Sequence, residues 1–273
     1  MKILISVDAE GLPGLTTGKQ TLANYSDYGL ARTVMTDFVN SASQGALEGK
    51  ASSVTVVDSH DGNRNIFLKD LFPHTKLISG WPKELSMVEG IREADRVYFL
   101  GYHSMAGTEN GVLNHTYSAT VVHRLKYNGT EIGEIGMSAY VAGHFNKPVS
   151  LVAGDKAAVE EAKKIVPDAI QVVFKEALSR YAANNQPYND ALEELRMRSR
   201  EASSLSGSIA KIEGEIEISL EFQNTGQADN CMLLSDVSRE NGYTVVTKAM
   251  NAVEAYKKFR VLVSLASFEQ FGY

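Results

Sequence analysis

The chain of 273 residues contains one cysteine, Cys231, and this scarcity excludes an intrachain disulfide. The lack of disulfides fits a reducing compartment. No stretch approaches the ~18 consecutive apolar residues that a membrane-spanning helix requires. The N-terminal apolar run ends at Asp8, so it is too short for a signal peptide, and it lacks a cleavage site. These absences predict a soluble, cytoplasmic protein.

An excess of positive charge is also missing, since 27 Lys and Arg face 33 Asp and Glu, giving a net charge of -6. The tightest basic group, at 196–200, has acidic neighbours on both sides, which indicates a solvated helix face. The sequence therefore gives no basic footprint for nucleic acid or an anionic membrane. Hydrophobic residues make up 44% of the chain, which is enough for a sizeable core.

Apolar runs of strand length alternate with helical patterns along the first part of the chain. The runs that predict strands are 2–7, 54–57, 76–79, 96–100 and 149–153. Helical spacing predicts helices over 28–50, 134–144 and 155–165. Strands and helices in this alternation are typical of a mostly parallel sheet covered by helices. We therefore predict an α/β fold.

The pattern loosens around 181–190, and a polar helix then runs to about residue 202. Beyond a Ser-rich stretch, residues 215–222 alternate strictly between apolar and polar, which indicates a strand with one wet side. A further strand at 243–247 and a final helix within 249–271 complete a smaller α+β unit. We predict an α/β domain over 1–185 and a smaller α+β domain over 186–273.

Acidic and imidazole side chains follow three of the predicted strands. Asp8 and Glu10 follow the first, His60 the second and His103 the fourth. In extended backbone, residues i and i+2 point to the same side, so Asp8 and Glu10 are expected to aim at one place. Two anions that converge repel each other unless a cation lies between them.

The carboxyl ends of parallel strands lie side by side at one edge of a sheet, where open α/β proteins place their ligands. These four side chains can therefore meet, and they predict a metal site. Carboxylate and imidazole without thiolate suit zinc, with manganese or cobalt as neighbours.

Each residue also has a structural interpretation. An Asp at a strand end commonly caps a turn or a helix, and a single His commonly packs in a core or lies on the surface. The coincidence of three strand ends favours the metal. The histidines at 74, 123 and 144 stand in less informative contexts, and we interpret them as structural.

Six short motifs stand in one order along the first 155 residues: SVDAEG at 6–11, VDSHDG at 57–62, FLGYH at 99–103, NH at 114–115, GEIG at 133–136 and AYVAG at 139–143. In order and spacing they resemble the D-aminopeptidase family of metallopeptidases, M55. The second half of the chain resembles the family only loosely, and no functional residue is carried over from it.

The resemblance implies a dinuclear zinc aminopeptidase that uses metal-activated water on short peptides or amino-acid amides with an N-terminal D-residue. It also implies a ring-like homo-oligomer, a decamer. Motif by motif, the implied metal ligands are Asp8, Glu10, His60, His103 and Glu134. Asp8 is expected to bridge the two ions, with Glu10 and His60 on one and His103 and Glu134 on the other.

The resemblance gives His115 the position of the catalytic histidine. It is expected to donate a hydrogen bond to the oxyanion or a proton to the leaving amine. Asp58, two residues before His60, either supports that ligand or has a structural role.

Two other hypotheses stay open at this point. The first is a metal-dependent amidase on another non-standard amide, including one with an L-residue. The second is a non-catalytic regulatory protein whose metal is structural or absent. Five ligands and His115 argue against the non-catalytic protein, because a structural zinc site is usually closed by four ligands and often uses Cys. Stereochemistry depends on the shape of the pocket, which the sequence does not give.

Overall fold

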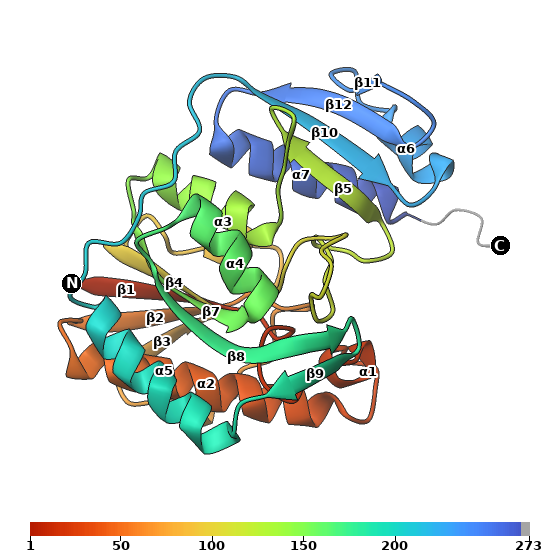
Figure 1. The fold of residues 1–273 in the computed structure, drawn as a ribbon. Helices are drawn as coiled ribbons and strands as arrows, with labels where there is room; N and C mark the ends of the chain where they lie inside the picture. The colour runs from red at the N-terminus through yellow and green to blue at the C-terminus, as the bar shows by residue number, and fades with distance from the viewer. Residues whose placement is uncertain (269–273) are drawn as a thin grey trace.

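A seven-stranded sheet, sheet A, forms the centre of the computed structural model, which describes residues 1–268 (Figure 1). The order of its strands is β3-β2-β1-β4-β7-β8-β9. All neighbouring strands are parallel except β8 and β9. The strands are β1 Lys2–Val7, β2 Ser53–Asp58, β3 Thr75–Ile78, β4 Arg96–Tyr102, β7 Val149–Asp155, β8 Ile170–Ser179 and β9 Ala182–Asn185. The predicted mostly parallel sheet is confirmed.

Helices cover both faces of sheet A (Figure 1). On one face lie α2 (Tyr28–Glu48) and α5 (Tyr188–Ala202), and on the other lie α3 (Glu134–His144) and α4 (Lys156–Ile165). Alternate strand residues enter the two cores, since Ile3 and Ile5 pack with α2 while Leu4 faces the opposite core. Burial on both faces is the reason why these strands read as continuous apolar runs.

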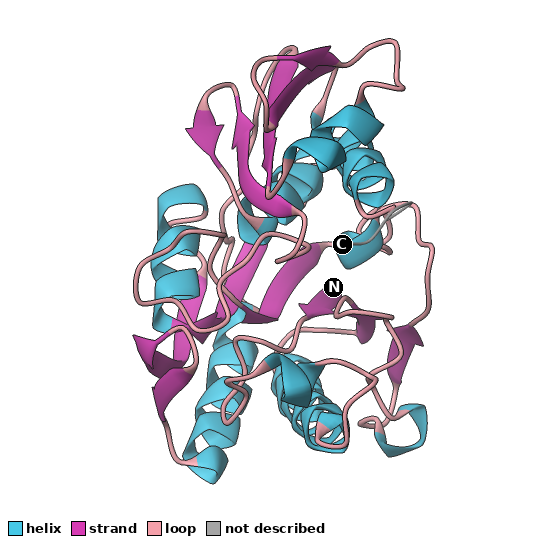
Figure 2. Ribbon diagram, turned by 90° about the vertical axis from the view of Figure 1, so that its right-hand side faces the viewer, coloured by secondary structure: helices cyan, strands magenta, loops and turns pink. Residues whose placement is uncertain are grey.

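A second, antiparallel sheet of five strands, sheet B, has the order β11-β12-β10-β5-β6. The helix α7 packs between sheet B and α3, so it joins the two parts of the structure (Figure 2). In β10 the apolar residues are buried, as the alternation predicts. The elements are β5 Val122–Tyr127, β6 Thr130–Glu131, β10 Ile216–Phe222, α6 Thr225–Cys231, β11 Ser238–Arg239, β12 Thr244–Ala249 and α7 Ala252–Ala266.

Segments before and after residue 185 contribute both to sheet A with its helices and to sheet B with its helices. The strands β5 and β6 lie before it, yet β5 pairs with β10 in sheet B. The helix α5 lies after it, yet it packs against α2 on sheet A. The division into domains at 185 stays a prediction about independently folding units.

Short elements complete the chain: α1 (Gly18–Thr21) and two 3₁₀ turns at Leu68–Asp70 and Ser86–Val88. Of the predicted final helix, 252–266 is helical, and 269–271 lies outside the described residues. Within residues 1–268, no helix combines the length and the apolar character needed to cross a membrane.

The carboxyl ends of β1 and β4 approach each other closely. The amide of Asp8 donates to the Leu100 carbonyl and the amide of Gly11 to the Gly101 carbonyl, both at 2.8 Å. An added Cβ at Gly101 would lie 2.1 Å from the carbonyl oxygen of Asp8. The segment that carries Asp8 and Glu10 is therefore seated directly on the end of β4.

This contact predicts that Gly101→Ala lowers the free energy of unfolding far more than Gly107→Ala does. Both glycines have positive φ, +71° and +82°, but nothing lies within 4 Å of a Cβ at Gly107. Gly107→Ala should lower the free energy of unfolding by about 1–2 kcal/mol through backbone strain alone. Gly101→Ala should lower the free energy of unfolding by a further ~1–3 kcal/mol through overpacking. Denaturant unfolding of both variants measures this difference. Equal losses for the two variants would contradict the close seating.

Candidate metal centre

The structure brings the six implied residues together at the carboxyl edge of sheet A. Asp8 and Glu10 follow β1, His60 follows β2 and His103 follows β4. The other two arrive from elsewhere: Glu134 is the first residue of α3, and His115 lies in the loop between β4 and β5.

Asp8 occupies the middle of the group. Its Oδ1 lies 3.1 Å from Nδ1 of His60, and its Oδ2 lies 3.5 Å from Nε2 of His103. Glu10 Oε2 is also 3.1 Å from Nδ1 of His60, and Glu134 Oε1 is 3.3 Å from Nε2 of His103. The arrangement is thus two pairs of a histidine and a glutamate, with one oxygen of Asp8 directed to each pair.

The side chains of Asp8 and Glu10 converge, but for a different reason from the one expected. The strand β1 ends at Val7, and residues 9–10 form a bend and a turn instead of extended backbone. The hydrogen bonds to the end of β4 fold this segment back over the sheet. The convergence therefore depends on the neighbouring strand and not on alternation along β1.

Each histidine has one ring nitrogen bonded to a backbone carbonyl. His60 uses Nε2 toward Thr21 (2.7 Å), His103 uses Nδ1 toward Ser104 (2.9 Å), and His115 uses Nδ1 toward Leu113 (2.9 Å). A carbonyl only accepts, so these nitrogens carry the hydrogen, and each neutral ring turns a lone pair toward the carboxylates.

Lone pairs that face carboxylates in a buried site are unfavourable without a cation. Among residues 1–268, the buried atoms without a hydrogen-bond partner include Glu10 Oε2 and His103 Nε2, both directed into this group. Oxygen and nitrogen donors without sulfur suit zinc. The residues present therefore fit a bound metal.

The ionisation of the group shows the same need for positive charge. Burial and the charge of Glu10 raise the pKa of Asp8 to about 7. Burial would also lower the pKa of His60 and His103, but the facing carboxylates outweigh it and raise both well above the usual value. Without a metal, protons on these rings must balance the carboxylates.

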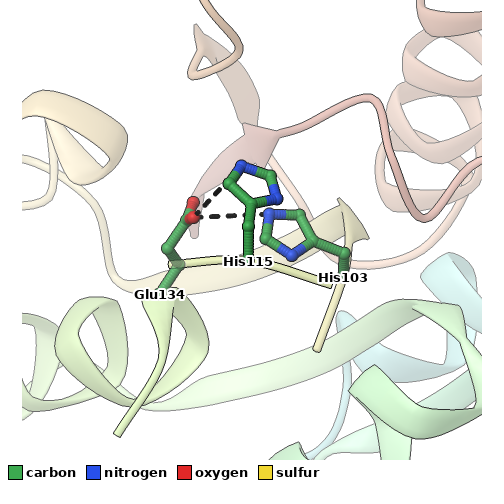
Figure 3. A group of neighbouring side chains, drawn as sticks. All are labelled: His103, His115 and Glu134. Carbon is green, nitrogen blue, oxygen red and sulfur yellow. Dashed lines mark ion pairs between the residues drawn. The ribbon is translucent and has the colours of Figure 1, made fainter. Parts of the chain in front are cut away.

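His115 differs from the other five residues in its exposure. Its side chain is 18% exposed, whereas the others are 8% exposed or less. Its ring stacks on that of His103 with centroids 4.0 Å apart, and its Nε2 lies 3.9 Å from Glu134 Oε1 (Figure 3). Burial and the charge of His103 lower the pKa of His115.

The loop that carries His115 is strained and firmly held. Leu113 and Tyr117 have φ values of 51° and 64°, which bulky residues rarely adopt. The amide of Tyr117 donates to Glu134 Oε1 at 2.6 Å, and that of Val112 donates to Asp155 Oδ2 at 3.0 Å. Such strain persists where surrounding contacts fix the conformation, as they do here.

Two buried lysines hold the segments that carry Glu10 and His60, and the sequence analysis missed both. Lys175 donates to the carbonyls of Glu10, Leu12 and Leu15 at 2.6, 2.7 and 2.5 Å. Lys83 donates to the Asp58 carbonyl at 2.6 Å. The signal for Lys175 was available, because a lysine after the apolar run 172–174 of a buried strand needs buried acceptors.

Asp58 supports the loop around His60 through the backbone. Its carboxylate accepts hydrogen bonds from the amides of Asn65 (2.6 Å) and Ile66 (3.1 Å) and from the Asn65 side chain, which also donates to the His60 carbonyl. The three remaining histidines, at 74, 123 and 144, are exposed and do not belong to this group of six residues.

A cleft of about 700 Å³ opens over the group. Five of the six residues line it, while His103 lies beneath. Trp81, Leu22, Arg180 and Tyr181 also line the cleft. This volume lies within the usual range of small-ligand sites, roughly 300–1,000 Å³.

Comparisons with known proteins identify the family of this chain. The family model for Peptidase_M55, described as D-aminopeptidase, matches residues 1–261. A D-aminopeptidase from Bacillus subtilis (strain 168) is 33% identical over 270 residues, covering 97% of this chain and 98% of the relative. Among solved structures, the Zn-dependent D-aminopeptidase DppA from Bacillus subtilis, a self-compartmentalizing protease, superposes with a TM-score of 0.95 at 32% identity, with full coverage of both chains.

A family match over nearly the whole chain and a relative above 30% identity establish the family. This chain belongs to the M55 peptidases and is a metallo-aminopeptidase, a hydrolase of peptide bonds.

Proposed function

We propose that this chain is a dinuclear zinc aminopeptidase that releases an N-terminal D-residue from short peptides or amino-acid amides. The observation that carries the proposal is Asp8, whose two carboxylate oxygens are directed to two histidine and glutamate pairs. The Zn-dependence and the D-aminopeptidase activity of the relatives support it.

In this proposal two zinc ions would share Asp8. Glu10 and His60 would hold one ion, and His103 and Glu134 would hold the other, as the pairing of these side chains favours. Zinc in such a site supplies a Lewis acid and lowers the pKa of water toward ~7. Manganese or cobalt remains an alternative with the same ligands.

His115 moves the proton. Because its Nδ1 donates to the Leu113 carbonyl, its Nε2 holds a hydrogen only when the ring is charged. With this hydrogen bond in place the neutral ring offers Nε2 as an acceptor, which favours proton transfer over donation to the oxyanion. We infer that Nε2 takes a proton from the attacking water and passes it to the leaving amine as the C–N bond breaks.

Assembly and location are part of the proposal as well. The solved relative is a self-compartmentalizing protease, and we propose that this chain also forms a ring-like homo-oligomer, a decamer. We propose a cytoplasmic location, which suits the single, buried and unpaired Cys231.

The central experiment is the ratio of kcat/KM for D- and L-alaninamide and for D,D- and L,L-dialanine, measured with zinc present and after verified metal removal. We expect hydrolysis only with metal and a preference for the D forms. A preference for the L forms would instead favour the amidase on L-residues and leave the metal site unaffected. Full activity of the metal-free protein would end the proposal.

The bridging position of Asp8 predicts that Asp8→Asn lowers the occupancy of both metals, because both ions share this carboxylate. Metal content by mass spectrometry should fall from up to two ions per chain toward none. Asp61→Asn is the matched control, since Asp61 lines the same cleft but is exposed. Two ions bound with unchanged affinity in Asp8→Asn would contradict the assignment.

His115→Ala should keep both metals and the fold but lose ~10²–10⁴-fold in kcat, the usual contribution of one positioned acid–base group. The measurements are steady-state kinetics and metal analysis on the same preparation. His144→Ala, at an exposed histidine that ends α3, is the control. Loss of metal together with activity would make His115 a ligand, and a near-normal kcat would remove it from the mechanism.

A further inference from the structure

The charges that line the cleft are unevenly distributed. Four acidic residues line it, namely Asp8, Glu10, Asp61 and Glu134. Among the described lining residues, Arg180 is the only lysine or arginine. A short peptide carries an amine at one end and a carboxylate at the other, so the second charge calls for a cation away from the acidic centre.

Arg180 lies in the turn between β8 and β9, far along the chain from every proposed ligand. Its carbonyl accepts from the Leu113 amide at 2.9 Å, and its guanidinium donates to the Asn114 carbonyl at 3.1 Å. These bonds place Arg180 beside the segment that carries His115.

The guanidinium retains the capacity to bind an anion. It has five N–H donors, and its hydrogen bonds within the described chain go to Asn114 and to the Tyr181 hydroxyl (2.8 Å). Arg124 is different, because it pairs with Glu131 at 3.0 Å and approaches Glu221 at 3.6 Å. Within residues 1–268, the side chain of Arg180 has no such carboxylate neighbour.

Beside Arg180 the cleft continues past the acidic centre. A second hollow of about 320 Å³ adjoins the cleft, and His115, Ala119 and Arg180 line both. A substrate whose scissile bond lies beside His115 can therefore extend past it along Arg180. That part of the substrate is the leaving side, which ends in the carboxylate.

We propose that Arg180 binds the free C-terminal carboxylate of a short peptide and so makes this enzyme selective for di- or tripeptides over amides and blocked peptides. The proposal rests on the proposed aminopeptidase function. Arginine suits this role because its planar fork binds a carboxylate through two hydrogen bonds. The contact is present before and during the reaction, so its loss should raise KM more than it lowers kcat.

The test compares D-alanyl-D-alanine with its C-terminal amide, in zinc-loaded wild type and in Arg180→Gln. Wild type should prefer the free acid. Arg180→Gln should lose about 10–100-fold in kcat/KM on the free acid, mostly through KM, since hydrogen bonds to charged groups contribute ~1.5–3 kcal/mol. The kcat/KM of Arg180→Gln on the amide should change little. On the free acid, the kcat/KM of Arg180→Lys should lie between those of wild type and Arg180→Gln. Arg124→Gln, in the adjoining hollow, is the control and should keep the wild-type preference.

A tripeptide, tri-D-alanine, locates the subsite, because each residue extends the chain by roughly 3.3–3.6 Å. Arg180→Gln should lose more kcat/KM on one of the two peptides than on the other. The length of the peptide that loses more indicates how far Arg180 lies from the scissile bond. Either result supports the proposal, and no loss on either overturns it.

Two further outcomes would overturn the role of Arg180. Equal losses in kcat on the acid and the amide would mean that Arg180 only holds the loop of His115. Equal use of the free acid and its amide by wild type, for the dipeptide and for the tripeptide alike, would mean that no carboxylate is recognised. D-Alaninamide has no C-terminal carboxylate, so its hydrolysis by wild type reports on the aminopeptidase function separately. If wild type cleaves no substrate, the proposed function fails and this proposal with it.

Discussion

The repulsion among three buried carboxylates is the constraint on which the rest of this structure depends. Asp8, Glu10 and Glu134 all direct oxygens into one small volume, and each neutral histidine there presents a lone pair. Such a group is stable only with positive charge inside it, from protons or from metal ions. The site is therefore built to hold a cation, and the fold supplies the force that keeps its ligands close.

That force comes from backbone contacts around the ligands. Gly101 lets the end of β4 touch the carbonyl of Asp8, and Lys175 gathers three carbonyls of the segment after it. Lys83 and Asp58 do the same for the loop that carries His60. Separating a buried charged group from its partners is costly. These contacts therefore hold the segments in place against the repulsion between the carboxylates.

The acidic centre and Arg180 come from different parts of this architecture. The acidic centre is assembled at the ends of the central strands, whereas Arg180 comes from the turn that joins β8 to the antiparallel edge strand β9. The loop carrying His115 contacts both regions, through Glu134 on one side and Arg180 on the other. One strained loop thus links the acidic centre to Arg180.

The sequence by itself determined the parallel sheet and the residue types of the candidate site, because strand-length apolar runs and the residues that follow them are local features. Asp8, Glu10, His60 and His103 could be found in this way, and Glu134 and His115 through their motifs. Only the tertiary structure decided that β5 pairs with β10, that α5 packs on α2, and that Lys175 and Arg180 reach the site. It also decided which nitrogen of His115 faces the site, since that follows from one carbonyl bond to Leu113. Contacts between segments far apart in the chain leave no periodic pattern in the sequence, because they depend on packing and not on local conformation.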